Sequence, residues 1–368
     1  MRFHWFLPTT GDGRSIVAGG HGLGRTHGDA EYRAPSVEYL GQIAKAAEQV
    51  GFEAVLTPTG TWCEDAWLIT AALTQVTTRL KFLVAFRPGL LSPTLAAQMA
   101  ATYQRVSGGR LLLNVVTGGE AAEQARFGDH LSKDERYART DEFLSVVRGA
   151  WQGGLDFTGT YYDVADARVA APPEPAPEIY FGGSSGAAGP VAAKHADVYL
   201  TWGEPPAQVG EKLRWIRDLA AAEGRTLRYG VRLHVITRDT SEEAWAEAGR
   251  LLERIPSGDV AKARELLSTS ESVGQKRMLA LHEGFTGGRA RDLEIHPGLW
   301  AGVGLVRGGA GTALVGSHAE VADLLEEYAA HGASEFILSG YPHLEEAYWF
   351  GEGVLPELRR RGLVAKAA

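Results

Sequence analysis

Residues 80–116 read LKFLVAFRPGLLSPTLAAQMAATYQRVSGGRLLLNVV, and this stretch decides the fold. Its two ends, residues 80–86 and 110–116, are nearly continuous apolar runs, as found in parallel strands that are covered on both faces. Between them, Ser92 followed by a proline predicts the start of a helix, and Gly108 predicts its end. The stretch therefore indicates one strand–helix–strand unit.

The same alternation of apolar runs and helical patterns extends in both directions along the chain. An N-cap at Ser36 with a terminal glycine at Gly51, and a capping box formed by Ser132 and Glu135, mark two further helices. Strands are predicted at residues 3–7, 52–57, 80–86, 110–116, 178–181, 197–202, 229–237 and 335–339. Helices are predicted at residues 37–50, 93–107, 133–147, 205–223, 241–254 and 321–331. Strand–helix units repeated in this way predict an α/β fold of the (β/α)₈ TIM-barrel type; a doubly wound open sheet is the alternative.

One connection is too long for a single helix. Roughly residues 256–316 separate the last two strands, so we expect a partly helical insertion within one domain spanning residues 1–368. The insertion ends in a glycine-dense stretch at residues 302–311. Glycine at this density predicts unusual dihedral angles and mobility, as in a lid over an active site; a surface loop without a catalytic part is the alternative.

Composition and charge exclude several classes of protein. The 368 residues are 45% apolar with a formal net charge of −8, which argues against disorder and, without a basic cluster, against nucleic-acid binding. No apolar run approaches the roughly 18 residues of a membrane span, and the N-terminus lacks a signal-peptide pattern. A single cysteine cannot form an intrachain disulfide, so we expect a reducing, cytoplasmic location. The eleven histidines show no metal-ligand spacing, so no metal site is predicted.

The seventh predicted strand carries polar residues that indicate a charged site inside the barrel. Arg232 and His234 share one parity, and the apolar residues around them share the other. Because side chains alternate between the two faces of a strand, both polar residues are expected to face the lumen. A buried guanidinium is costly unless it meets an anion, so an anionic ligand is favoured over a structural ion pair with an internal carboxylate.

Other strand ends carry weaker signals. The Gly-Gly-Ser-Ser turn at residues 182–185 could hold a phosphate, but it is also an ordinary strand-to-helix turn. Cys63 has no nearby His–Asp pattern, so a pocket-lining role is favoured over that of a nucleophile. Arg307, inside the glycine-dense stretch, could close over an anion, although an exposed loop arginine is the commoner case.

Longer segments identify a family. They are WFLPTTGDG, CEDAW, RLKFLVAFRP, SPTLAAQMAAT, GRLLLNVVTGG, YFGGSS, YLTWGEPP, RLHVI, LWAGVGLVRGGAGTALVG and SGYPHLEEAYWFGE. Through them, and over nearly its whole length, the sequence resembles the flavin-dependent alkanesulfonate monooxygenases of the bacterial luciferase-like superfamily. The resemblance implies a TIM barrel with an insertion, reduced FMN (FMNH₂) supplied by a separate NAD(P)H-dependent flavin reductase, and O₂ as cosubstrate. It also implies cleavage of the C–S bond of an organosulfonate to an aldehyde and sulfite, by a homodimer or homotetramer.

The resemblance also implies a set of site residues. On the flavin side these are Asn114, Thr117, Arg136, Tyr137, Ser184 and Ser185. On the sulfonate side they are Trp202, Arg232, His234, Arg307, Tyr341 and His343, with Arg232, His234, Tyr341 and the flavin-proximal Cys63 expected to be catalytic. The residue types agree, because arginine suits an always-ionised sulfonate and the Gly-Gly-Ser-Ser turn suits the FMN phosphate. Arginine is a poor base, with a pKa above roughly 12, so Arg232 is assigned to anion binding and the base is left open between the oxygenated flavin and His234.

Two features depart from the family. Thr10 stands where members commonly have histidine, and residues 14–33 are unusually rich in glycine, histidine and arginine, with His21 and His27 expected to be solvated. Extra polar groups on this first loop suit a hydroxylated sulfonate, so sulfoquinovose is ranked beside simple alkanesulfonates. Two other functions stay open: another flavin- or deazaflavin-dependent oxidoreductase of the same fold, and a non-catalytic flavin-binding protein.

Overall fold

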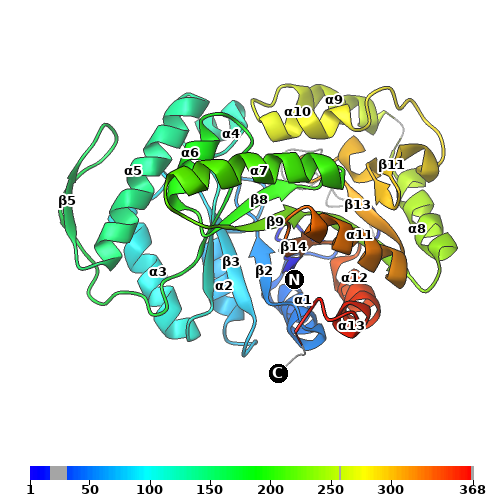
Figure 1. The fold of residues 1–368 in the computed structure, drawn as a ribbon, viewed down its shortest axis with the longest axis horizontal. Helices are drawn as coiled ribbons and strands as arrows, with labels where there is room; N and C mark the ends of the chain where they lie inside the picture. Colours follow the sequence, from blue (N-terminus) through cyan, green and yellow to red (C-terminus); the bar gives the residue numbers. More distant parts are fainter. Residues whose placement is uncertain (17–30, 257, 366–368) are drawn as a thin grey trace.

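Eight parallel strands close into a barrel in the order β1, β14, β9, β8, β7, β4, β3, β2 (Figure 1). The computed structural model describes residues 1–16, 31–256 and 258–365 of the chain. The barrel strands are β1 (Arg2–Phe6), β2 (Ala54–Thr57), β3 (Lys81–Phe86), β4 (Leu111–Val115), β7 (Ile179–Gly182), β8 (Val198–Trp202), β9 (Arg228–Arg232) and β14 (Glu335–Leu338). Each barrel strand pairs with the barrel strand that follows it in the chain, and β1 pairs with β14 to close the barrel. The predicted (β/α)₈ TIM barrel is therefore confirmed.

Helices surround the barrel and connect its strands (Figure 1). They are α1 (Val37–Val50), α2 (Ala66–Leu73), α3 (Pro93–Ser107), α4 (Ala121–Arg126), α5 (Lys133–Trp151), α6 (Ala188–His195), α7 (Pro206–Ala222), α8 (Ser241–Glu253), α11 (His318–Ala330), α12 (His343–Trp349) and α13 (Leu355–Arg360). The predicted caps are present: Ser36 accepts a hydrogen bond from the Tyr39 amide, Gly51 has φ of 105°, and Ser132 and Glu135 form their capping box. The sequence pattern does not predict the helices of eight residues or fewer, because two turns are too short to show a period.

The prediction of a single strand at residues 229–237 is wrong. The barrel strand β9 ends at Arg232, and β10 (His234–Arg238) belongs to a second sheet with β13 (Ala313–Ser317), β12 (Leu299–Trp300) and β11 (Glu294–His296). The chain changes partner at Leu233, whose amide donates to the carbonyl of Ile337, while the next amide donates to the carbonyl of Thr312. The apolar pattern continues through this change because the strand is buried in both sheets, so no sequence signal marks the break.

Residues 258–316 form a folded unit over the C-terminal side of the barrel (Figure 1). The unit contains α9 (Asp259–Ser268), α10 (Val273–Ala280), the 3₁₀ turns η1 (Ala290–Leu293) and η2 (Gly302–Leu305), and the strands β11 to β13. A hairpin of β5 (Leu155–Thr158) and β6 (Asp163–Ala167) extends from the opposite side.

The glycines of residues 302–311 serve close packing more than unusual dihedral angles. Of the five glycines in this stretch, only Gly309 has a positive φ, of 87°. A Cβ on Gly302 would lie 2.0 Å from the Trp300 ring, and one on Gly311 would lie 2.8 Å from Cα of Gly304. The expectation of unusual dihedral angles throughout this stretch is therefore wrong, because close backbone contact is what three of these glycines permit.

The N-terminal end of the barrel is filled by a polar network centred on Glu335. Its fully buried carboxylate lies 3.0 Å from His4 Nε2 and accepts hydrogen bonds from the Tyr180 hydroxyl at 2.8 Å and Arg228 Nε at 2.6 Å. Burial alone would raise the pKa of Glu335, but the hydrogen bond and charge of His4 and the hydrogen bonds from Arg228 and Tyr180 lower it to about 2. This end is closed, which leaves the C-terminal end for a binding site.

In the described part of the chain, no helix combines the length and the apolar character needed to cross a membrane.

Candidate active site

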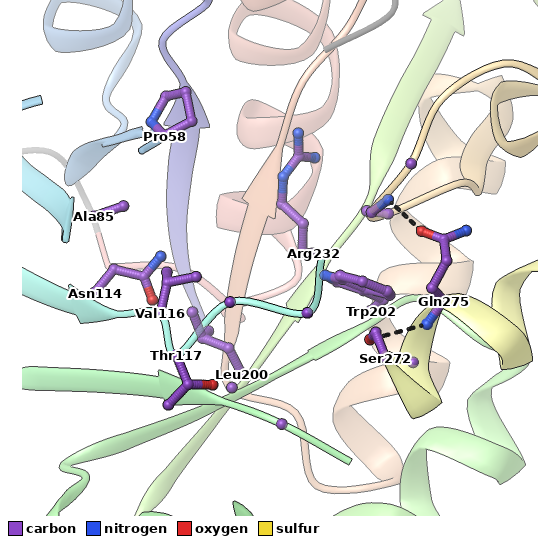
Figure 2. Close-up of a pocket in the computed structure, with 18 of the residues that line it drawn as sticks. Pro58, Ala85, Asn114, Val116, Thr117, Leu200, Trp202, Arg232, Ser272 and Gln275 are labelled. Carbon is purple, nitrogen blue, oxygen red and sulfur yellow. Dashed lines mark hydrogen bonds between the residues drawn. The ribbon is translucent and has the colours of Figure 1, made fainter. Parts of the chain in front are cut away.

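A cavity of about 300 Å³ opens at the C-terminal ends of the barrel strands, where the active sites of (β/α)₈ enzymes lie. Apolar side chains of the barrel interior (Phe6, Leu56, Leu200 and Ile337) form its base. Loops after the strands form its walls, and the segment between α9 and α10 closes one side (Figure 2). Eight of the predicted site residues line it: Asn114, Thr117, Tyr137, Ser184, Ser185, Trp202, Arg232 and Arg307.

Two arginines lie side by side at the barrel end of this cavity. The guanidinium carbons of Arg232 and Arg307 are 4.7 and 5.5 Å from the centroid of the Phe6 ring. Both side chains are buried, and within the described ranges neither has a carboxylate within 4 Å. Burial lowers the pKa of Arg232, and the positive charge of Arg307 lowers it further. Buried cations without a counter-ion are costly, so this region suits an anionic group of a ligand.

His234 lies against this arginine pair. Its Nε2 is 3.1 Å from the carbonyl oxygen of Ala310 and 3.3 Å from Arg307 Nη1, and its Nδ1 is 2.7 Å from Ser339 Oγ. Tyr341 stacks on its ring, with centroids 5.4 Å apart. Burial holds the pKa of His234 well below its ordinary value, and the neighbouring arginines lower it further, so the imidazole is neutral. The structure thus brings Arg232 and His234 together, although from different sheets.

His343, the first residue of α12, does not line the cavity. Its Nδ1 lies 2.9 Å from Asp12 Oδ1, and its backbone amide donates to Asp12 Oδ2 at 2.8 Å. Its ring contacts the Tyr341 ring edge to face at 5.3 Å. Tyr341 and His343 therefore form a second row behind the arginine pair.

A second polar region lies at the other end of the cavity. It is lined by Lys133, Tyr137, Ser184 and Ser185, which combine an ammonium group with three hydroxyls. The turn is tight, since a Cβ on Gly183 would lie 2.6 Å from the Cβ of Ala188 and 3.0 Å from the Tyr137 hydroxyl. A cation and hydroxyl donors around a glycine turn fit a phosphate group.

A less polar wall connects the two regions. Figure 2 shows Pro58, Ala85, Val116 and Leu200 on this wall, with Asn114 and Thr117 beside them. Trp202 stands opposite, packed so closely on the insertion that a Cβ on Gly274 would lie 3.0 Å from its ring. A flat apolar wall with a few polar groups fits a planar heteroaromatic ring such as that of a flavin.

Arg136, predicted on the flavin side, points to the insertion and does not line the cavity. Its Nη2 lies 3.1 Å from Glu271 Oε2, and its Nη1 donates to the carbonyl of Leu131 at 2.6 Å. On the other side of the insertion, Arg277 forms an ion pair with the buried Glu204. These two ion pairs hold the insertion over the cavity.

Cys63 also lies outside the cavity lining. Its Sγ is 3.7 Å from the carbonyl oxygen of Pro58 and 3.6 Å from that of Gly60. Burial raises the pKa of the thiol to about 12, so it is protonated at neutral pH. A protonated thiol is a weak nucleophile, which agrees with the sequence-based argument against a nucleophilic cysteine. The prediction that Cys63 lines the pocket is wrong, because its side chain bonds to carbonyls of its own loop.

Several cavity residues carry no clear sequence signal. Ser272 and Gln275 reach the cavity from the insertion; Gln275 accepts a hydrogen bond from the Gly309 amide at 2.9 Å, and Ser272 accepts one from the Gln275 amide at 3.2 Å (Figure 2). Lys133 could have been found, because it directly follows the predicted cap at Ser132 and is the first residue of α5. Trp62 and Arg87 could have been found by following the second and third strands to their ends.

The histidine- and glycine-rich first loop lies mostly outside the described residues. Residues 17–30, with His21 and His27, belong to the undescribed part. Thr10 is described, and its carbonyl accepts a hydrogen bond from the Tyr32 hydroxyl at 3.3 Å.

Comparison with known proteins agrees with this fold. Residues 1–335 match the luciferase-like monooxygenase family. The riboflavin lyase RcaE, solved with modified FMN and riboflavin, has a TM-score of 0.81 at 22% identity, covering 100% of this chain and 93% of its own. The long-chain alkane monooxygenase LadA has a TM-score of 0.79 at 21% identity, again covering 100% of this chain and 93% of its own. DmoA from Hyphomicrobium sulfonivorans has a TM-score of 0.74 at 20% identity, covering 100% of this chain and 89% of its own. At these identities the solved structures support the fold, and the family match supports the conclusion that this chain belongs to the luciferase-like monooxygenase family, a family of enzymes.

Proposed function

We propose that this protein is a two-component flavin-dependent monooxygenase that uses reduced FMN and O₂ to cleave the C–S bond of an organosulfonate, yielding an aldehyde and sulfite. The observation that carries the proposal is the buried pair of Arg232 and Arg307, which has no carboxylate partner among the described residues. A sulfonate is ionised at every physiological pH and presents three oxygens, which the forked donors of arginine match. Family membership supports the reaction class.

The two ends of the cavity support a division between cofactor and substrate. Lys133, Tyr137, Ser184 and Ser185 would hold the phosphate of FMN, and Asn114 and Thr117 would contact its ring system. When bound, reduced FMN supplies the electrons that activate O₂. The substrate would then lie between the ring and the arginine pair.

The protein's own residues bind and orient the substrate and exclude water. Arg232 and Arg307 would hold the sulfonate, and the base of the cavity at Phe6 would pack against its carbon chain. His234 is poorly suited to accept the substrate proton, because both of its nitrogens are engaged and its pKa is lowered by burial. Since the insertion carries Arg307 and is held by ion pairs, it would both complete the anion site and shield it from water.

The insertion supports a polar substrate. Ser270, Ser272 and Gln275 of the insertion add hydroxyl and amide groups to the cavity, which the ring of Trp202 also lines. Glu120, just before α4, adds a carboxyl group. Such groups can pair with sugar hydroxyls, and an aromatic face can pack on a sugar ring. We therefore keep sulfoquinovose beside simple alkanesulfonates as the proposed substrate.

The test is a sulfite-release screen with FMN, NADH, O₂ and a separately purified flavin reductase. Sulfoquinovose and linear alkanesulfonates of increasing length are compared, with anaerobic reactions and reactions without FMN as controls. Oxygen- and FMN-dependent sulfite from any sulfonate supports the proposal, and the ratio between the substrate classes assigns the specificity. Absence of sulfite from all of them contradicts it.

The same preparation separates the two other functions. Substrate turnover without oxygen would indicate a hydride-transferring flavin or deazaflavin enzyme of the same fold. Stoichiometric oxidised FMN retained through purification, without turnover, would indicate a flavin-binding protein. The reductase partner and the homodimeric or homotetrameric state belong to the same proposal, and sedimentation of the enzyme alone and with the reductase measures both.

A further inference from the structure

Ser339 directly follows β14 and contacts two residues of the arginine region. It is fully buried, and its Oγ lies 2.8 Å from Arg232 Nη2 and 2.7 Å from His234 Nδ1. Its carbonyl accepts a hydrogen bond from the Val235 amide at 2.8 Å, which holds the backbone in place. One hydroxyl thus bridges the end of β9 and the start of β10, where the chain leaves the barrel sheet.

The direction of each hydrogen bond follows from the chemistry of the groups. A guanidinium can only donate, so Ser339 Oγ accepts from Arg232. His234 Nε2 lies 3.1 Å from the carbonyl oxygen of Ala310, which can only accept, and 3.3 Å from Arg307 Nη1, which can only donate. The shorter contact to the carbonyl places the proton of the neutral ring on Nε2, and Arg307 Nη1 then donates to the same carbonyl at 3.5 Å. Nδ1 is then an acceptor, and the Ser339 hydroxyl donates to it.

The chain of hydrogen bonds reaches both arginines. It runs from Arg232 through Ser339 and His234 to the carbonyl of Ala310, which also lies 3.5 Å from Arg307 Nη1. Every donor in this chain has an acceptor, which is the condition for a buried polar network to be rigid.

We infer that Ser339 is a positioning residue that sets the orientation of Arg232 and the tautomer of His234, and so couples the two arginines that form the anion site. The nature of the anion rests on the proposed function, whereas the hydrogen-bond arrangement does not. In this role Ser339 touches no ligand and acts through the two residues that it contacts.

The first experiment measures the tautomer of His234 and needs no ligand. ¹⁵N-detected NMR of the histidine rings should show an Nε2-protonated neutral His234 ring from pH 6 to 8. The His234 signals are assigned as those missing from the spectrum of the His234→Asn variant, which keeps Ser339. Ser339→Ala removes the donor to Nδ1 and should shift or broaden these signals. An Nδ1-protonated ring in the wild-type protein would overturn the inference.

The second experiment measures affinity for inorganic sulfate by calorimetry. Ser339→Ala should bind sulfate at least ~10-fold more weakly, because Arg232 loses its fixed orientation. Ser334→Ala is the matched control: its hydroxyl lies just before β14, at the closed end of the barrel, 3.4 Å from the carbonyl of Tyr229. Its sulfate affinity should stay within about twofold of wild type.

Coupling is tested by combining Ser339→Ala with Arg307→Met. If Ser339 links the arginines, its effect on sulfate affinity should shrink to less than ~3-fold in the Arg307→Met protein, whereas independent effects would multiply. Unchanged tautomer and unchanged sulfate affinity in Ser339→Ala would refute the inference. If that variant does not fold, Ser339→Cys keeps the volume with a weaker donor and should give intermediate shifts. If the wild-type protein shows the expected tautomer of His234 but releases no sulfite from any sulfonate, only the proposed function is contradicted.

Discussion

Asp12 accepts two hydrogen bonds from His343, one from its backbone amide at 2.8 Å and one involving Nδ1 at 2.9 Å. The two residues are 331 positions apart, so this contact joins the first loop to the first turn of α12. Burial would raise the pKa of Asp12, but the charge and hydrogen bond of His343 lower it, so the carboxylate is ionised.

Replacing Asp12 with asparagine should destabilise the protein by about 2 kcal/mol, because a buried hydrogen bond to a charged group is lost and a donor faces a donor. Urea denaturation at pH 7 measures the change. Asp134→Asn, an exposed position on α5, is the control and should change stability by less than about 0.5 kcal/mol. Equal stability of the two variants would show that the contact with His343 contributes nothing.

Replacing Arg232 with lysine should raise KM for the sulfonate by about 10- to 100-fold while kcat falls by less than about 5-fold, because lysine keeps the charge but not the forked geometry. Steady-state sulfite release measures both constants. A fall in kcat larger than the rise in KM would show that Arg232 takes part in the chemical step, against its assignment to anion binding.

Replacing Lys133 with methionine should weaken FMN binding by about 10-fold and riboflavin binding by less than about 2-fold. In the proposed site the ammonium group would contact the phosphate, which riboflavin lacks, and would not contact the flavin ring. Quenching of flavin fluorescence measures both affinities. Lys262→Met, at an exposed position on α9, is the control for loss of a surface charge. Parallel loss of both flavins in Lys133→Met would place the phosphate elsewhere.

Acid should destabilise the barrel through Glu335. Its folded pKa of about 2 lies below the ordinary value, so its contribution is complete above about pH 4.5 and is lost as pH falls towards 2. The loss over this window should be about 3 kcal/mol. Chemical denaturation at several pH values should show a shallower pH dependence for Glu335→Gln than for wild type, whereas the exposed Glu352→Gln should leave the slope unchanged.

Cys63 should react slowly with iodoacetamide. With a pKa of about 12, its thiolate fraction at pH 8 is about 1000-fold below that of an ordinary cysteine, and alkylation should slow accordingly. Mass spectrometry of native and urea-unfolded protein compares the two rates. Labelling of the native protein at the unfolded rate would contradict the half-buried, hydrogen-bonded position of the thiol.

The barrel was predictable because its signals are local. Continuous apolar runs mark strands covered on both faces, and the caps at Ser36 and Ser132 mark helix starts by a side chain that bonds a nearby amide. The short helices and the break at Leu233 were not predictable. A two-turn helix shows no period. The amides of Leu233 and His234 bond to different strands, and which strand each one meets depends on where distant residues lie.

The site was predictable only in part, because some of its residues are marked by local signals and others reach it through contacts with distant segments. Arg232 and the Gly-Gly-Ser-Ser turn follow strands directly, so their place at the open end of the barrel follows from the fold. Ser339 resembles any serine at the end of a strand, and only its position between Arg232 and His234 makes it notable. Gln275 reaches the cavity because the insertion folds back over the barrel, which no local pattern encodes.

By itself, the sequence determined the eight-stranded barrel, the principal helices and the strand ends at which polar residues gather, since each depends on periodicity and capping within a few residues. Only the tertiary structure decided that the seventh strand divides between two sheets, that Cys63, Arg136 and His343 lie outside the cavity, and that Arg307 returns from the insertion to stand beside Arg232. These features depend on contacts between segments far apart in the chain. Their free energy comes from packing and hydrogen bonds that form only when the whole barrel is closed.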